Sequence, residues 1–182
     1  MLEWGIIKFS PEKGYTADAT SWIHYTGTDI CEVAYALAET DDHSLLCGYY
    51  KGLYEYDGNT TRQLHQTLKG DIIKIESMVP DPSGGVWIGT RSQGVIHYYN
   101  DKHWTQYTVE EGLVSNSVSS IMIGSDSSIW VATDKGISLF DRNKWTRLAL
   151  PRHFKIIRDH GFLLRDSDNS IWVCKSSKEW FR

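Results

Sequence analysis

The sequence predicts an all-β fold in which one four-stranded unit is repeated along the chain. Three observations predict it: a motif that recurs every 41 to 43 residues, short alternating apolar runs divided by turn residues, and many large aromatics. Eight Trp and ten Tyr among 182 residues favour the half-buried pleated surfaces of strands. The chain is long enough for one domain with a substantial core.

The repeat has an anchor residue, which is Trp in three copies and Leu in the first. The anchors are Leu46, Trp87, Trp130 and Trp172. A small residue follows two positions later in each copy: Gly48, Gly89, Ala132 and Cys174. We predict that Trp87, Trp130 and Trp172 are buried at equivalent places, and that Gly89, Ala132 and Cys174 form a column of tight packing between neighbouring units.

Each copy divides into four strand-like runs, which we name A to D. Run A contains the apolar residue nine positions before the anchor, a polar turn follows, and run B contains the anchor. Run C begins at a Gly, as in "GVIHYY" from Gly94, and run D is aromatic, as around Trp104 and Trp145. A period near 42 with four strands per unit is typical of a β-propeller blade.

One segment has a second interpretation. In "ICEVAYALAE", which starts at Ile30, the apolar residues fall at helical spacing. Read in the register of the repeat, the same segment is strand A of the first full unit. We predict a strand, because four aligned copies outweigh one local period.

The two ends of the chain resemble parts of a blade. Residues 5–9 match run C and Trp22–Tyr25 match run D. We expect one propeller domain or segment, divided into a partial blade at 1–28, blades at about 29–71, 72–114 and 115–155, and a partial blade at 156–182. Either the ends combine in one blade of a closed four-bladed ring, or the chain is a segment that pairs with further blades.

Two stretches carry a family resemblance. "DPSGGVWIGTRSQGVIHYY" from Asp81 and "EEGLVSNSVSSI" from Glu110 resemble the two-component regulator propeller repeat and its linker between blades. The resemblance implies an extracytoplasmic sensor domain of a bacterial signalling protein, with saccharides as ligands of some members. It also favours the segment over the closed ring, because the rings associated with this repeat are larger.

Composition argues against several other classes. The net charge is −4 with no basic block, so nucleic acid is not expected as a partner. The longest apolar run, VAYALA, is far shorter than a membrane span, and the first ten residues do not form a signal peptide.

The three Cys have no CxxC spacing, and the seven His include no metal-binding pair. "RDSDNS" at 165–170 resembles a calcium loop but matches the polar turn of the other copies. No metal or cofactor is expected.

The loops between runs B and C are the candidate ligand-binding elements, because all such loops emerge on one face of a propeller. The copies agree in their strands and diverge in these loops, and scaffolds carry function on variable loops. Aromatic, charged and amide groups suit sugars or carboxylated ligands. The candidate residues are Tyr49, Tyr50, Lys51, Arg91, Gln93, Asp134 and Lys135.

The expected function is ligand sensing in a bacterial two-component-type regulator, with a small molecule or saccharide as ligand. Self-association or further blades are the other expected partners. Two alternatives remain open: a propeller enzyme of the lyase type, and a protein-interaction scaffold. No catalytic residue is assigned, because the repeats supply no recognisable cluster of catalytic side chains.

Overall fold

The structure is a computed structural model that describes residues 6–9, 22–25, 34–49, 52–64, 73–99, 103–141, 143–150 and 162–174. The chain divides into two compact units, Met1–Ala34 and Tyr35–Arg182. The described residues contain strands and turns and no helix. None of them, accordingly, belongs to a helix long and apolar enough to cross a membrane.

The first unit contains one antiparallel strand pair. Strand β1 (Ile6–Phe9) pairs with β2 (Trp22–Tyr25), with Ile6 opposite Tyr25. Both strand predictions are therefore confirmed. Their assignment to strands C and D of a blade shared with the other end of the chain stays a prediction.

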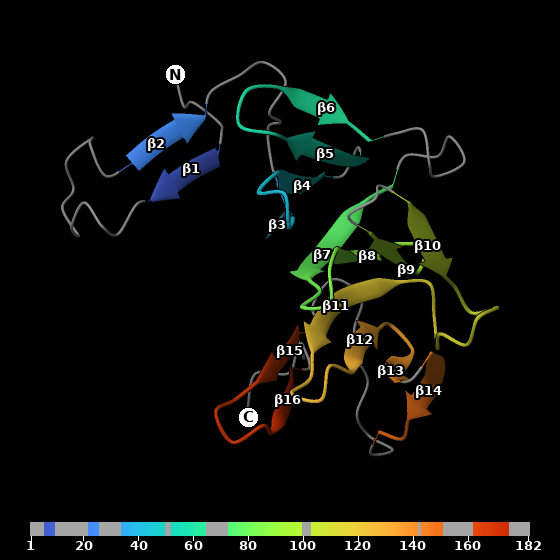
Figure 1. Ribbon diagram of the computed structural model, residues 1–182. Helices are drawn as coiled ribbons and strands as arrows, with labels where there is room; N and C mark the ends of the chain where they lie inside the picture. Colours follow the sequence, from blue (N-terminus) through green and yellow to red (C-terminus); the bar gives the residue numbers. More distant parts are fainter. Residues whose placement is uncertain are drawn as a thin grey trace, which may run out of the picture. The chain divides into compact units, whose positions relative to one another are not determined.

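The second unit contains three four-stranded antiparallel sheets and one two-stranded sheet, each with its strands in chain order (Figure 1). The first sheet is β3 (Ala36–Glu39), β4 (Leu45–Tyr49), β5 (Gly52–Tyr56) and β6 (Thr61–Gln63). The second is β7 (Ile75–Pro80), β8 (Val86–Thr90), β9 (Val95–Tyr98) and β10 (Trp104–Tyr107). The third is β11 (Val118–Ile123), β12 (Ile129–Thr133), β13 (Gly136–Asp141) and β14 (Lys144–Leu148). The fourth has β15 (Phe162–Arg165) and β16 (Ile171–Cys174).

These sheets confirm runs A to D as the strands of one repeated unit. The helical interpretation of the segment from Ile30 is wrong for its described part, because Ala36–Glu39 is strand β3. The anchors Leu46, Trp87 and Trp130 lie on the second strand of successive sheets, and Trp172 lies on β16. The division into blades at the expected boundaries, and the closure of a ring, stay predictions.

The turn between strands A and B has the same geometry in all four sheets. In the second sheet Asp81 donates its N–H to the carbonyl of Gly85, and the Asp81 carbonyl accepts from the N–H of Gly84. The equivalent residues of the other three sheets form the same two hydrogen bonds. The residue at the Gly84 position has a positive φ in each copy: His43, Gly84, Ser127 and Asn169. This is the pattern of a three-residue hairpin loop ending in a left-handed residue. Asp166 of "RDSDNS" accepts the N–H groups of Asp168 and Ser170 at 3.0 and 2.9 Å, which favours the turn over a calcium loop.

Consecutive sheets pack face to face. We call the side of a sheet that carries the anchor its anchor face, and the other side its reverse face. The first core contains Leu46 and Leu53 of one anchor face with Ile75, Ile88 and other apolar residues at the reverse face of the next sheet. The second core packs Trp87 and Val95 in the same way against Val118, Ile121 and Val131. The third brings Ala132 and Ile137 to Leu163 and Val173.

Consecutive sheets approach each other closely at the small-residue column. A Cβ on Gly89 would lie 2.6 Å from Cγ1 of Val118, and one on Gly48 would lie 2.7 Å from Cβ of Ile75. Ala132 is fully buried at the third position of the column. Tight packing between consecutive sheets is therefore confirmed at Gly89 and at Ala132, which packs with Leu163 and Val173 of the fourth sheet, and Gly48 extends the column to the first sheet. The side chain of Cys174 lies outside the described part, so its burial stays a prediction.

The anchors differ in burial although they share one register. Trp87 is 3% exposed and Trp130 is half-buried, whereas Trp172 is 64% exposed. The prediction that all three are buried is wrong for Trp172. Its register is right, since Trp172 pairs with Leu164 as Trp87 pairs with Val79. The physical reason is that an anchor face is covered by the next sheet along the chain: the third sheet covers Trp87, and the described residues contain no sheet after β16 to cover Trp172.

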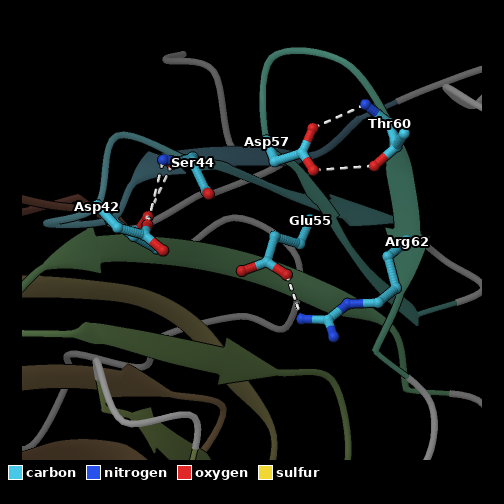
Figure 2. Close-up of polar contacts among 7 residues, drawn as sticks. Asp42, Ser44, Glu55, Asp57, Thr60 and Arg62 are labelled. Atoms are coloured by element: carbon cyan, nitrogen blue, oxygen red, sulfur yellow. Dashed lines mark hydrogen bonds and ion pairs between the residues drawn. The ribbon is translucent and has the colours of Figure 1, made fainter.

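The first sheet has Leu46 in place of an aromatic anchor, and an ion pair between Glu55 and Arg62 lies beside it (Figure 2). Glu55 lies opposite Leu46 and is 6% exposed, and its carboxylate is paired with the guanidinium of Arg62 on β6. An unpaired carboxylate at this depth would be costly, so Arg62 permits Glu55 at a core position. Asp57 closes the adjoining hairpin by accepting from the backbone and hydroxyl of Thr60 at 2.7 and 2.9 Å.

The repeat also allows the same Asp–Trp hydrogen bond to be compared in a buried copy and an exposed copy, in each of which the Asp also accepts from the turn between strands A and B. Trp87 and Trp172 both donate from Nε1 to an Asp six residues earlier, Asp81 and Asp166, at 2.7 Å. Only the first pair is buried. We expect Asp81→Ala to lower the free energy of unfolding by about 1.5–3 kcal/mol, because it leaves a buried donor unpaired.

Urea denaturation of the full chain measures this difference. Asp166→Ala is the control, and we expect a clearly smaller loss because water replaces the carboxylate at an exposed indole. Equal losses for the two variants would contradict the assignment of Trp87 to a core between sheets and of Trp172 to an open face.

Candidate ligand-binding face

The loops between strands B and C lie at the same end of the sheets as the starts of strand A. Backbone hydrogen bonds tie the two: Arg91 N to the Lys74 carbonyl at 2.9 Å, and Asp134 N to the Ser117 carbonyl at 3.2 Å. Tyr35, just before β3, likewise donates to the carbonyl of Gly48 at 2.8 Å. We call this end of the second unit the B–C loop face.

Each described B–C loop is held by a buried Thr at the end of strand B. Thr90 Oγ1 donates to the Gly94 carbonyl and accepts from the Gln93 N–H, at 2.8 and 2.9 Å. Thr133 Oγ1 donates to the Gly136 carbonyl at 2.8 Å, and both Thr side chains are fully buried. These bonds fix the loop backbone and leave its other side chains free to vary. Sequence reasoning missed both Thr residues, although each recurs three positions after an anchor.

A charged cluster occupies the face between the first and second sheets. The Glu76 carboxylate lies 3.1 Å from Lys74 Nζ and 3.3 Å from an Nη of Arg91. The Lys74 ammonium also lies over the Tyr35 ring, 4.7 Å from its centroid, which is a cation–π distance. Tyr35 is 48% exposed and the Arg91 side chain 34%, so both are open to solvent.

The structure therefore joins Arg91 to three residues that sequence reasoning missed. Tyr35 and Lys74 lie in the segments leading into strand A, where the repeat pattern marks no function. Only Glu76 could have been singled out from the sequence, because it is a charged residue within the largely apolar strand A of the second sheet. What brings the four together is the packing of two consecutive sheets, which no local pattern encodes.

The other predicted residues have different environments. Gln93 lies in the same loop as Arg91, and its carbonyl accepts from Gln106 Nε2 at 2.8 Å. Asp134 and Lys135 lie in the next B–C loop, on the third sheet, where Lys135 is exposed. Tyr50 and Lys51 lie outside the described residues.

Tyr49 lies in strand β4 and not in a loop. It is 2% exposed, and its ring packs edge-on against that of Tyr54 with centroids 5.3 Å apart. A stacking platform has to be open to the ligand, so the structure gives Tyr49 a packing role in place of the predicted binding role.

A groove of about 600 Å³ lies at the opposite end of strands β7, β11 and β15. Apolar side chains from these strands line it together with the A–B turns: Met78, Val79, Pro80, Pro82, Ile121, Met122, Ile123, Leu163 and Leu164 are among them. Arg165 is the cation in its lining. The groove therefore lacks the combination of open ring and paired charges found on the B–C loop face.

Comparison with known proteins confirms the resemblance and the fold. Residues 112–135 match the family model described as two component regulator propeller. The chain is similar to the extracellular domain assigned to the hybrid two component system BT3049 from B. thetaiotaomicron, with a TM-score of 0.71 and 17% identity over 87% of this chain and 22% of that one. It thus spans about a fifth of the length of that structure. The all-β propeller prediction is confirmed.

Propellers of other kinds are also similar. Virginiamycin B lyase from Staphylococcus aureus has a TM-score of 0.61 and 13% identity, over 78% of this chain and 48% of that chain. PorZ, a surface component of the type-IX secretion system of Porphyromonas gingivalis, has a TM-score of 0.59 and 18% identity, over 75% and 22% of the two chains. At these identities the similarity shows the fold. No curated protein matches the sequence.

One buried polar pair lies away from the B–C loop face. His97 is 5% exposed and its ring stacks on that of Trp87 with centroids 4.0 Å apart. Its Nε2 lies 3.1 Å from Oδ2 of Asp81. Burial lowers the pKa of the His97 imidazole below 6.5, although the Asp81 carboxylate acts in the opposite direction.

The His97 shift predicts a pH dependence of stability. Because the folded pKa is depressed, the unfolded chain binds the proton more readily, and folding stability is lost as the pH falls below about 6.5. We expect the free energy of unfolding to fall between pH 7 and pH 5, and this slope to become shallower in His97→Gln. Urea titrations at each pH measure the slope. His43→Gln, at an exposed histidine, is the control; an unchanged slope in His97→Gln would refute the assignment.

Proposed function

We propose that this chain, which carries the two component regulator propeller repeat, is the ligand-binding part of a bacterial sensor and works outside the cytoplasm. Its ligand is a saccharide that carries negative charge, and the ligand binds on the B–C loop face. The observation that carries this proposal is the cluster of Tyr35, Lys74, Glu76 and Arg91.

The charges of the cluster favour an anionic ligand. Two cations, Lys74 and Arg91, share the single carboxylate of Glu76. Glu76 orients both side chains, and the three residues together carry two positive charges and one negative charge. The guanidinium of Arg91 can form bidentate hydrogen bonds with a carboxylate or sulfate.

The aromatic ring favours a saccharide over a simple acid. Tyr35 is half-exposed beside the cations, and a flat ring offers its face to the apolar side of a sugar. Gln93 and the loop of Asp134 and Lys135 provide further amide and charged groups at the same end of the sheets. Tyr50 and Lys51 remain part of this proposal.

The location and the signalling role rest on similarity. The repeat is that of two-component regulators, and the extracellular domain of BT3049 has the same fold. Ligand capture by such a domain is a binding event, so the proposal assigns no catalytic residue.

A lyase is the second candidate, favoured by the similarity to virginiamycin B lyase. A lyase needs a base that is open to its substrate. In the described part of the B–C loop face, the Glu76 carboxylate is held by two cations, and His97 is buried elsewhere. This arrangement favours the binding of an anion over the abstraction of a proton.

Isothermal titration of the full chain with galacturonate and glucuronate oligosaccharides tests the proposal. Neutral galacto-oligosaccharides of the same length are the matched ligands. We expect the acidic series to bind more tightly, and Arg91→Ala to weaken that binding by about 10- to 150-fold, since a charge-assisted hydrogen bond contributes about 1.5–3 kcal/mol.

Two further variants make the result specific. Arg147→Ala removes an exposed cation from the outer strand β14 and should bind like the parent. Met122→Lys changes the groove at the opposite end of the sheets. If no acidic saccharide binds, or if Met122→Lys abolishes binding while Arg91→Ala does not, the B–C loop face is the wrong site.

A further inference from the structure

The hairpin between β5 and β6 carries a modification motif. Asn59-Thr60-Thr61 is the one place in the sequence where an Asn is followed, two positions later, by Ser or Thr. This is the acceptor sequence for asparagine-linked glycosylation, a modification of surface loops in secreted proteins. Asp57 adds an acidic residue two positions before Asn59, as bacterial oligosaccharyltransferases require. A short motif also occurs by chance, so its structural context decides whether it can act.

The structure presents the motif to solvent. Residues 57–60 form the turn of the hairpin and are all exposed. The hairpin lies at a sheet edge, because β6 is the outer strand of the first sheet. Neither the carboxamide of Asn59 nor the hydroxyl of Thr61 forms a hydrogen bond with any described residue. Both groups that a transferring enzyme has to reach are therefore available to it.

Other groups hold the turn in shape. Asp57 Oδ1 accepts the N–H groups of Asn59 and Thr60 at 2.8 and 2.7 Å, and Oδ2 accepts from the Thr60 hydroxyl at 2.9 Å (Figure 2). The hydroxyl of Tyr56 donates to the carbonyl of Gly58 at 2.7 Å. Gly58 has a φ of +98°, in the left-handed region that favours Gly. The Asn59 side chain has no part in these contacts, so its modification removes none of them.

The hairpin lies at the end of the first sheet away from the B–C loop. Tyr56, just before the turn, pairs with Leu45, the first residue of β4 after the A–B turn. At the other end of the same strand pair, Tyr49 pairs with Gly52 across the B–C loop. A glycan on Asn59 therefore starts from the end of this sheet that the candidate ligand-binding face does not use.

We propose that Asn59 is the acceptor of an N-linked oligosaccharide. The side-chain nitrogen of Asn59 forms a bond to the anomeric carbon of the sugar chain, and the bond from that carbon to a lipid diphosphate breaks. The lipid diphosphate leaves with the electron pair of that bond, and the amide proton passes to a base of the oligosaccharyltransferase. The proposal rests on the location outside the cytoplasm in the proposed function, because this transfer takes place there, and it does not depend on the ligand.

Incubation of the folded full chain with a bacterial oligosaccharyltransferase and a lipid-linked oligosaccharide tests the proposal. Mass spectrometry of the intact chain should show one added glycan, and peptide mapping should place it on Asn59. Asn169 is the internal control, since it is also exposed in a turn but is followed by Ser170 and Ile171. Because the reaction contains no ligand, its failure leaves the saccharide-binding proposal intact, and failed saccharide binding leaves this result intact.

Substitutions of the motif make the result specific. We expect Thr61→Val to abolish the modification, because it removes the hydroxyl at nearly constant shape, and Thr61→Ser to retain it. Asn59→Gln should stay unmodified. Far-UV circular dichroism confirms that each variant is folded. An unmodified parent chain would overturn the proposal, as would a glycan on Asn169, transfer that occurs only after the chain is unfolded, or equal modification of Thr61→Val and the parent.

Discussion

The close approach of consecutive sheets at the small-residue column is the constraint on which the rest of the structure depends. Gly48 and Gly89 have no room for a Cβ, because Ile75 and Val118 of the next strand A occupy that space. A strand A that lies this close covers the anchor of the preceding sheet and excludes water from it. Burial of Trp87, Ile88, Val131 and their neighbours then supplies the apolar area that stabilises the fold.

The same approach positions the candidate site. Strand A of each sheet begins beside the B–C loop, and the hydrogen bond from Arg91 N to the Lys74 carbonyl fixes one to the other. Once the first and second sheets pack, Tyr35 from one and Lys74 from the other come within cation–π distance. A rigid repeated interface therefore carries side chains that differ from copy to copy, which is how a repeat fold can acquire a specific ligand.

Much of this could be predicted from the sequence, and most of the failures have one cause. The alternating apolar pattern and the period near 42 predicted the strands and the register of Trp172, because these depend on residues within one unit. The alignment of the units predicted the small-residue column. The exposure of Trp172 depends on whether another sheet follows. The burial of Tyr49 and the cluster around Glu76 depend on contacts beyond a single repeat. The left-handed position at His43, Ser127 and Asn169 escaped notice because three different residue types occupy it.

The repeated close approach of Gly to the next strand A is the central claim, and nuclear Overhauser spectroscopy of the methyl-labelled full chain tests it directly. The account predicts strong cross-peaks from the Gly48 Hα protons to the Ile75 methyl groups, and from the Gly89 Hα protons to the Val118 methyl groups, because each pair is in van der Waals contact. Absence of both sets of cross-peaks in the folded protein would contradict the register and the packing of the sheets together.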